Sequence, residues 1–79
     1  MDIQKINEII KSVDPRFRTK IWQEYGKNYV FVHVDRTDKV IKVNLNKSEM
    51  YPSRPGAWTQ AIEIRDALKQ QIGVEFIIK

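Results

Sequence analysis

Two stretches of the chain, 28–34 and 40–46, lie on either side of the polar segment 35–39; the first is apolar on both of its faces, and the second alternates apolar and polar residues. Successive side chains of a β-strand point to opposite faces, so this pattern predicts two antiparallel strands joined by a three- to five-residue loop. One face of this hairpin is aliphatic throughout and is predicted to be core: Val30, Val32, Val34, Ile41, Val43 and Leu45. The opposite face carries Tyr29, Phe31 and His33 beside Lys42 and Asn44.

The residues before this hairpin alternate as well, and they predict a further strand over 16–25. Turn chemistry at Gly26-Lys27-Asn28 connects it to the hairpin, which makes a three-stranded antiparallel meander. If Phe17 and Ile21 face the core, the alternation places one aromatic and three basic side chains on the opposite face, next to Tyr29 and Phe31. These four residues are Arg16, Arg18, Lys20 and Trp22. A slip of one residue would reverse the assignment of a strand.

Two helices are indicated by apolar residues at three- and four-residue spacing, one over 2–13 with Asp2 as its cap and one over 57–72. Gly73 is expected to end the second helix in a left-handed conformation. Residues 74–78 predict a short last strand that follows a crossover helix and is expected to run parallel to the third strand. Its neighbour, the first or the third strand, is left open.

The segment 47–56 contains two prolines, a glycine and two serines, and is interpreted as the longest loop. The predicted fold is therefore an α+β two-layer sandwich with the order α-β-β-β-α-β. It has a three-stranded antiparallel meander, a short C-terminal strand and both helices on one face of the sheet. The other face of the sheet is expected to be uncovered.

Seventy-nine residues are expected to form a single domain, 1–79, because so short a chain cannot divide its core. The chain has no cysteine, and its charged first helix is neither a signal peptide nor a membrane span, so a cytoplasmic protein without a membrane partner is expected. Its 14 basic and 10 acidic residues are unevenly placed. Residues 16–47 hold eight basic and three acidic side chains, a net charge of +5, and the rest of the chain sums to −1.

Aromatic side chains set among basic ones are typical of surfaces that bind single-stranded nucleic acid, because rings stack on bases and cations meet phosphates. The uncovered face is the main candidate for such a site. A second, weaker candidate is the start of the second helix, where Ser53 and Arg54 could hold an anion, although Ser53 also suits an ordinary helix cap. The predicted binding residues are Arg16, Arg18, Lys20, Trp22, Tyr29, Phe31, His33, Lys42 and Arg54.

Two other interpretations remain open. The same aromatic face is also typical of a protein interface, in a homodimer, an adaptor or an inhibitor. The single histidine, His33, would have to be the catalytic group of a small RNA-cleaving toxin, although an imidazole packed on a sheet is the commoner role of such a residue. No other catalytic residue, no metal site and no cofactor is indicated, so a binding module is favoured over an enzyme.

The order of elements from Ile3 to Leu68 resembles that of double-stranded RNA-binding domains and of the HicA type of RNA-cleaving toxin, which uses one histidine on a strand. The resemblance is one of topology. Pro55-Gly56-Ala57-Trp58 stands where the former has a lysine-rich helix entrance, and Phe31-Val32 stands where the latter has a glycine-serine step before the histidine. The last strand belongs to neither.

Overall fold

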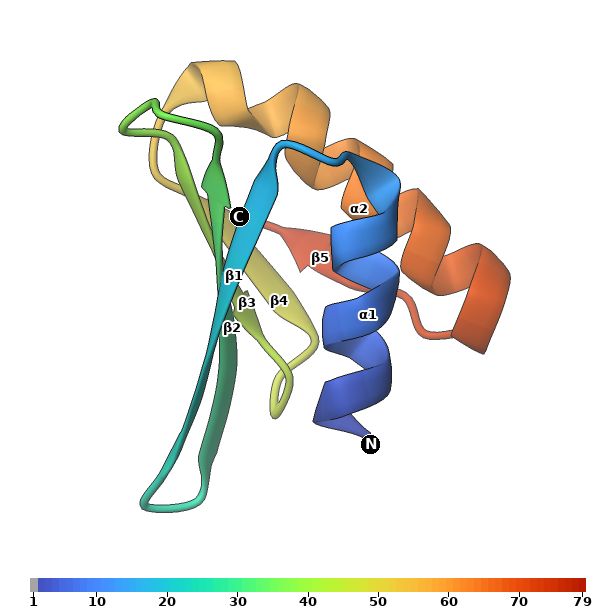
Figure 1. Ribbon diagram of the computed structural model, residues 1–79. Coiled ribbons are helices and arrows are strands. Elements are labelled where there is room, and N and C mark those ends of the chain that lie inside the picture. The colour runs from blue at the N-terminus through green and yellow to red at the C-terminus, as the bar shows by residue number, and fades with distance from the viewer. Residues whose placement is uncertain (1) are drawn as a thin grey trace.

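A five-stranded mixed sheet with two helices on one of its faces makes up the fold (Figure 1). The computed structural model describes residues 2–79. The α+β class, the mostly antiparallel sheet and the placement of both helices on one face are confirmed. In chain order the elements are α1 (Ile3–Val13), β1 (Phe17–Glu24), β2 (Lys27–Val34), β3 (Val40–Asn44), β4 (Glu49–Pro52), the 3-10 helix η1 (Pro55–Ala57), α2 (Trp58–Ile72) and β5 (Ile77–Ile78).

Both helices begin or end at the residue that the sequence indicates. The Asp2 carboxylate caps α1 by accepting hydrogen bonds from the backbone N–H groups of Gln4, at 3.0 Å, and Lys5, at 3.3 Å. Gly73 ends α2 at φ 70° and ψ 17°, a left-handed conformation that costs glycine little because it has no Cβ. The apolar stripes of the two helices face the sheet and bury Ile6, Ile10, Ile64 and Leu68 among others.

The register of the first three strands is the one that the alternation predicts. Val30 lies opposite Val43, and Val32 opposite Ile41, and all four side chains are fully buried under the helices. In β1 the core residue Phe17 lies opposite Val34. Burial of these aliphatic side chains is the main stabilising contribution to the fold, since apolar area removed from water contributes about 25 cal/mol per Å².

The prediction of a long loop over 47–56 is wrong, because residues 49–52 form β4. This strand pairs antiparallel with β3, and its Met50 lies opposite Val43 and is fully buried. Pro52 is tolerated at its end for a geometric reason. The N–H of Ser53 donates to Val40 of β3 at 2.8 Å, so the nitrogen of Pro52 faces the other side, beyond the two paired residues of β5.

The position of the last strand also differs from the expectation. β5 pairs with β4, parallel to it, and therefore runs antiparallel to β3. The chain crosses over through α2 from β4 to β5, so β4 is the strand to which β5 runs parallel. The sequence pattern did not reveal β4. Because β4 lies between β3 and α2, the order of elements from Ile3 to Leu68 also departs from the helix, meander, helix layout that it resembles.

Replacing Met50 by alanine tests whether β4 is an integral part of the core. Deleting a fully buried side chain removes its apolar contacts and leaves a cavity, so the free energy of unfolding in urea should fall by about 2–5 kcal/mol. Lys47→Ala, on an exposed residue just before β4, is the control and should change stability little. A small effect of Met50→Ala would mean that residues 49–52 are not packed as a strand.

Candidate functional site

Within residues 2–79 no helix covers the face of the sheet turned away from α1 and α2 (Figure 1), and the strand register places polar and aromatic side chains on that face. Residues paired across neighbouring strands point to the same face, so the register places these side chains in four rows, of which the outermost, beside the β1–β2 turn, consists of Glu24 and Lys27. We call the other three rows the open face. Its rows are Arg18, His33 and Val40; Lys20, Phe31, Lys42 and Tyr51; and Trp22, Tyr29, Asn44, Glu49 and Ile77.

A lysine held between two tyrosine rings lies at the centre of the open face. The Lys42 Nζ atom is 5.0 Å from the ring centroid of Tyr29 and 5.4 Å from that of Tyr51. Both distances are within the range of cation–π attraction. The rings of Tyr29 and Phe31 lie 6.0 Å apart at an angle of 52°. Among residues 2–79 no ion pair involves Lys42, so its positive charge is fixed in place without being neutralised.

A carboxylate at the edge of this cluster has two partners. Glu49 accepts a hydrogen bond from the Tyr51 hydroxyl and an ion pair from the Lys79 Nζ at 2.5 Å, and its side chain is only 13% exposed. The bonds from Lys79 and Tyr51 hold the pKa of Glu49 below its usual value. The same interactions raise the pKa of the Tyr51 phenol and of the Lys79 ammonium. The pair therefore adds little net charge and fixes the position of the Tyr51 ring.

The first two strands supply an exposed basic margin. Arg18, Lys20 and His33 are exposed, and none of the ion pairs within residues 2–79 includes them. Trp22 remains 42% exposed beside Tyr29. Together with Lys42, Arg18 and Lys20 give the open face three cations without a carboxylate partner, next to four aromatic rings. An arrangement of this kind offers flat surfaces for stacking and positive charge for an anionic chain.

Two of the predicted site residues are not brought to this surface. Arg16 precedes β1, and its Nη2 atom lies 2.8 Å from the Asp14 carboxylate, which holds it at the end of α1. Arg54 lies before η1 and pairs at 2.5 Å with Asp38 of the β2–β3 loop. The Arg16 guanidinium therefore closes a local turn after α1, and the Arg54 guanidinium connects two separate loops. The other seven predicted residues lie together on the open face: Arg18, Lys20, Trp22, Tyr29, Phe31, His33 and Lys42.

Sequence reasoning missed three residues of the open face, Tyr51, Glu49 and Ile77, and it also missed Lys79, which pairs with Glu49. The first two belong to β4, which the prolines and serines of its surroundings concealed. The signal was the alternation of Glu49, Met50 and Tyr51, in which one apolar residue lies between two polar or amphipathic ones. Three residues give too short a pattern to outweigh two prolines.

The start of α2 offers less than its sequence indicated. The hydroxyl oxygen of Ser53 accepts the backbone N–H of Val40 at 2.9 Å, so Ser53 joins β4 to β3 and the expectation that it caps the helix is wrong. The N-cap of α2 is Ala57, which makes no side-chain cap. Within residues 2–79 no three side chains of histidine, cysteine, aspartate or glutamate are gathered where they could hold a metal ion, and no helix suffices to span a membrane.

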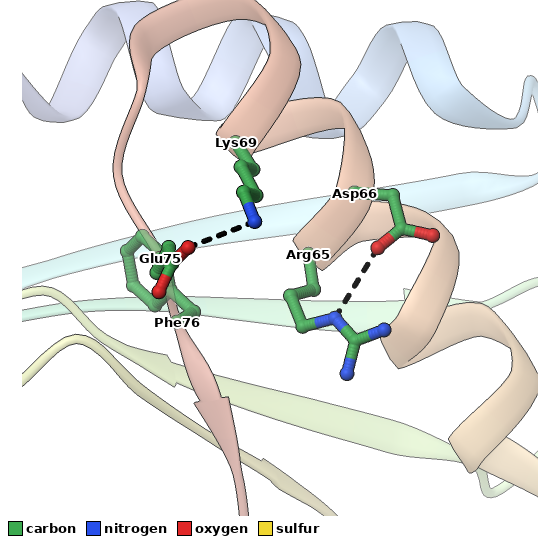
Figure 2. Close-up of a pocket in the computed structure, with 5 residues that line it drawn as sticks. All are labelled: Arg65, Asp66, Lys69, Glu75 and Phe76. Carbon is green, nitrogen blue, oxygen red and sulfur yellow. Dashed lines mark hydrogen bonds and ion pairs between the residues drawn. The ribbon is translucent and has the colours of Figure 1, made fainter.

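A polar pocket of about 270 Å³ lies on the helical side, between the C-terminal half of α2 and the segment that leads to β5 (Figure 2). Its cations already have partners. Lys69 pairs with Glu75 at 2.8 Å, and Arg65 with Asp66 at 3.2 Å, while the buried ring of Phe76 closes one side. Because each positive charge in the pocket is matched by a carboxylate, the pocket has no preference for an anion.

Comparison of the chain with protein-family models, with curated proteins and with solved structures finds no match.

Replacing Glu49 by glutamine tests the carboxylate network through the pH dependence of stability. The pKa of Glu49 in the folded protein lies below its ordinary value of 4.5, so the ionised group stabilises the fold above pH 4.5, and this contribution is lost as the pH falls through the lowered pKa. The thermal midpoint of Glu49→Gln should therefore fall less than that of the wild type between about pH 5.5 and about pH 3.

The matched control is Glu8→Gln, on an exposed α1 residue outside the ion pairs of residues 2–79. Parallel curves for wild type and Glu49→Gln below pH 4.5 would show that the carboxylate has no stabilising partners in solution.

Proposed function

We propose that the protein is a small binding module that binds single-stranded nucleic acid, RNA or DNA, on the open face of its sheet. The observation that supports this most directly is Lys42, which holds an unneutralised charge between two tyrosine rings at the centre of that face. A cation among rings suits a ligand that offers phosphates and flat bases together.

The arrangement of the rows gives the binding mode its detail. The row of Lys20, Phe31 and Lys42 places an aromatic ring between two cations on adjacent strands, which lie about 4.8 Å apart. A base stacked on Phe31 would therefore have a lysine on either side for its flanking phosphates. In the next row Trp22 and Tyr29 are directly paired and would take a further base.

The charge on the face favours a nucleic acid over a neutral partner. Arg18, Lys20 and Lys42 have no carboxylate partner within residues 2–79, whereas the acidic Glu49 is neutralised by Lys79. Binding that neutralises phosphates releases counterions, so affinity should fall steeply as salt rises. A protein contact through the same face would bury these cations and would depend less on salt.

Tryptophan fluorescence can test the proposal directly, because the two tryptophans lie on different layers. A Trp58→Phe protein reports Trp22 on the open face, and a Trp22→Phe protein reports Trp58 on α2. Titration with single-stranded oligonucleotides at low salt should quench Trp22 and leave Trp58 nearly unchanged, and added salt should reverse the quenching. No quenching at low salt would refute the proposal, and a sizing measurement would then look for a homodimer through this face.

Single substitutions should separate stacking from charge. Phe31→Ala removes a stacking surface, so we expect affinity to fall roughly 5- to 100-fold with the salt dependence retained. Arg18→Glu should weaken binding and reduce the slope of log affinity against log salt by about one or more. The control is Arg65→Glu, the same change of charge on α2, which should alter affinity little. Equal effects of Arg18→Glu and Arg65→Glu would mean that net charge, and not the open face, governs binding.

A further inference from the structure

The turn between β1 and β2 holds an aromatic residue in a backbone conformation that suits other residues better. Glu24 pairs with Lys27, so the turn consists of Tyr25 and Gly26, with φ values of 53° and 74°. Two consecutive positive φ angles define the tight turn in which asparagine, aspartate or glycine is preferred at the first position. Within residues 2–79 the other two non-glycine residues with positive φ, Asp35 and Ser48, are small and polar. Tyr25 alone is bulky, and a left-handed bulky residue is strained.

The Tyr25 side chain is not packed in the core. Its exposed fraction is 95%, the highest among the large apolar side chains that the structure leaves exposed. The hairpin that carries it reaches further from the body than the neighbouring β3–β4 turn (Figure 1). A strained position and full exposure both oppose tyrosine on grounds of stability, so stability does not account for this residue.

The tip that presents Tyr25 is braced by side-chain hydrogen bonds. The Asn46 amide donates to the Gly26 carbonyl at 3.1 Å and accepts the backbone N–H of Asn28 at 2.8 Å. The Gln23 amide also donates to the Asn28 side chain at 3.0 Å, across the two strands. The two bonds of Asn46 tie the hairpin to the loop that follows β3, and the bond of Gln23 joins β1 to β2. The Tyr25 ring is therefore exposed to solvent, while hydrogen bonds hold the backbone of its turn in place.

The tip adjoins the open face. Trp22, the outermost ring of that face, lies three residues before Tyr25, which follows the end of β1. Lys27 follows the turn and Lys47 adjoins the bracing Asn46, and both are exposed and outside the ion pairs of residues 2–79. A polyanion that leaves the face beyond Trp22 would meet two more cations and one more ring, beside the Glu24 carboxylate that lies opposite Lys27.

From these observations we propose that Tyr25 is a further stacking residue, which extends the bound length of single-stranded nucleic acid beyond Trp22 onto the hairpin tip. This inference rests on the proposed function of the open face. It adds that affinity rises with oligonucleotide length until the strand reaches the tip, and that the strain at Tyr25 is retained for binding.

The experiment measures two properties of one variant that should change in opposite directions. Tyr25→Asn places the residue preferred in this turn, so its thermal midpoint should rise by a few degrees. Its affinity for a single-stranded oligonucleotide of about ten nucleotides, measured by fluorescence anisotropy, should fall about 5-fold or more because a stacking ring is lost. Its affinity for a strand of about four nucleotides, which the open face alone accommodates, should stay within about 2-fold of wild type. Tyr25→Phe keeps the ring and should bind both strands as the wild type does.

The outcomes separate this inference from the proposed function. If the wild type binds and Tyr25→Asn binds the longer strand equally well, the hairpin tip is not part of the site and only this inference falls. If the wild type binds no oligonucleotide at low salt, both fall. A self-associated wild type that Tyr25→Asn converts to a monomer, without any effect on oligonucleotides, would make the tip a protein contact and would also overturn the inference.

Discussion

Two short helices supply enough apolar surface for only one face of a five-stranded sheet, and the rest of the structure depends on that limit. Most aliphatic residues of the strands therefore point to the covered side, where Val30, Val32, Ile41 and Val43 are fully buried, while Val40 and Ile77 remain on the open face. Residues of the opposite face then have only one another for cover. They meet this need by packing in rows, with aliphatic stems and rings partly shielded and polar ends directed outward.

Because no helix of residues 2–79 covers the open face, its polar groups are arranged by contacts with one another. A lysine in the middle of a sheet cannot move far from its neighbours, and Lys42 is flanked on two strands by rings instead of acids. The one nearby carboxylate, on Glu49, is already engaged by Tyr51 and Lys79. Charge on this side is therefore concentrated toward β1, β2 and β3, while the β4 and β5 side is close to neutral.

The sequence predicts those strands in which the alternation of core and surface residues continues over several positions. The aliphatic residues of 30–34 and 41–45 give six consistent positions, enough to fix the register, and the seven predicted residues that the structure gathers on the open face follow from it. The six are Val30, Val32, Val34, Ile41, Val43 and Leu45. Glu49, Met50 and Tyr51 give only three positions beside two prolines, so β4 and its part of the open face were missed. The sequence did not single out Tyr25, because what makes this residue unusual is its positive φ angle. That angle is set by the turn and cannot be recognised from the residue type alone.

The strands lie side by side in the order in which the chain makes them, and this has a consequence for folding. Three of the four strand pairings join neighbours through short turns, so closing them costs little chain entropy. Only β4 and β5 must wait for an intervening helix, and they share two residue pairs. This last contact is the weakest place in the sheet, where local opening would begin and hydrogen exchange would be fastest. Such opening would release Lys79 from Glu49 and expose Met50 to water. The pairing of β5 with β4 therefore protects this part of the core.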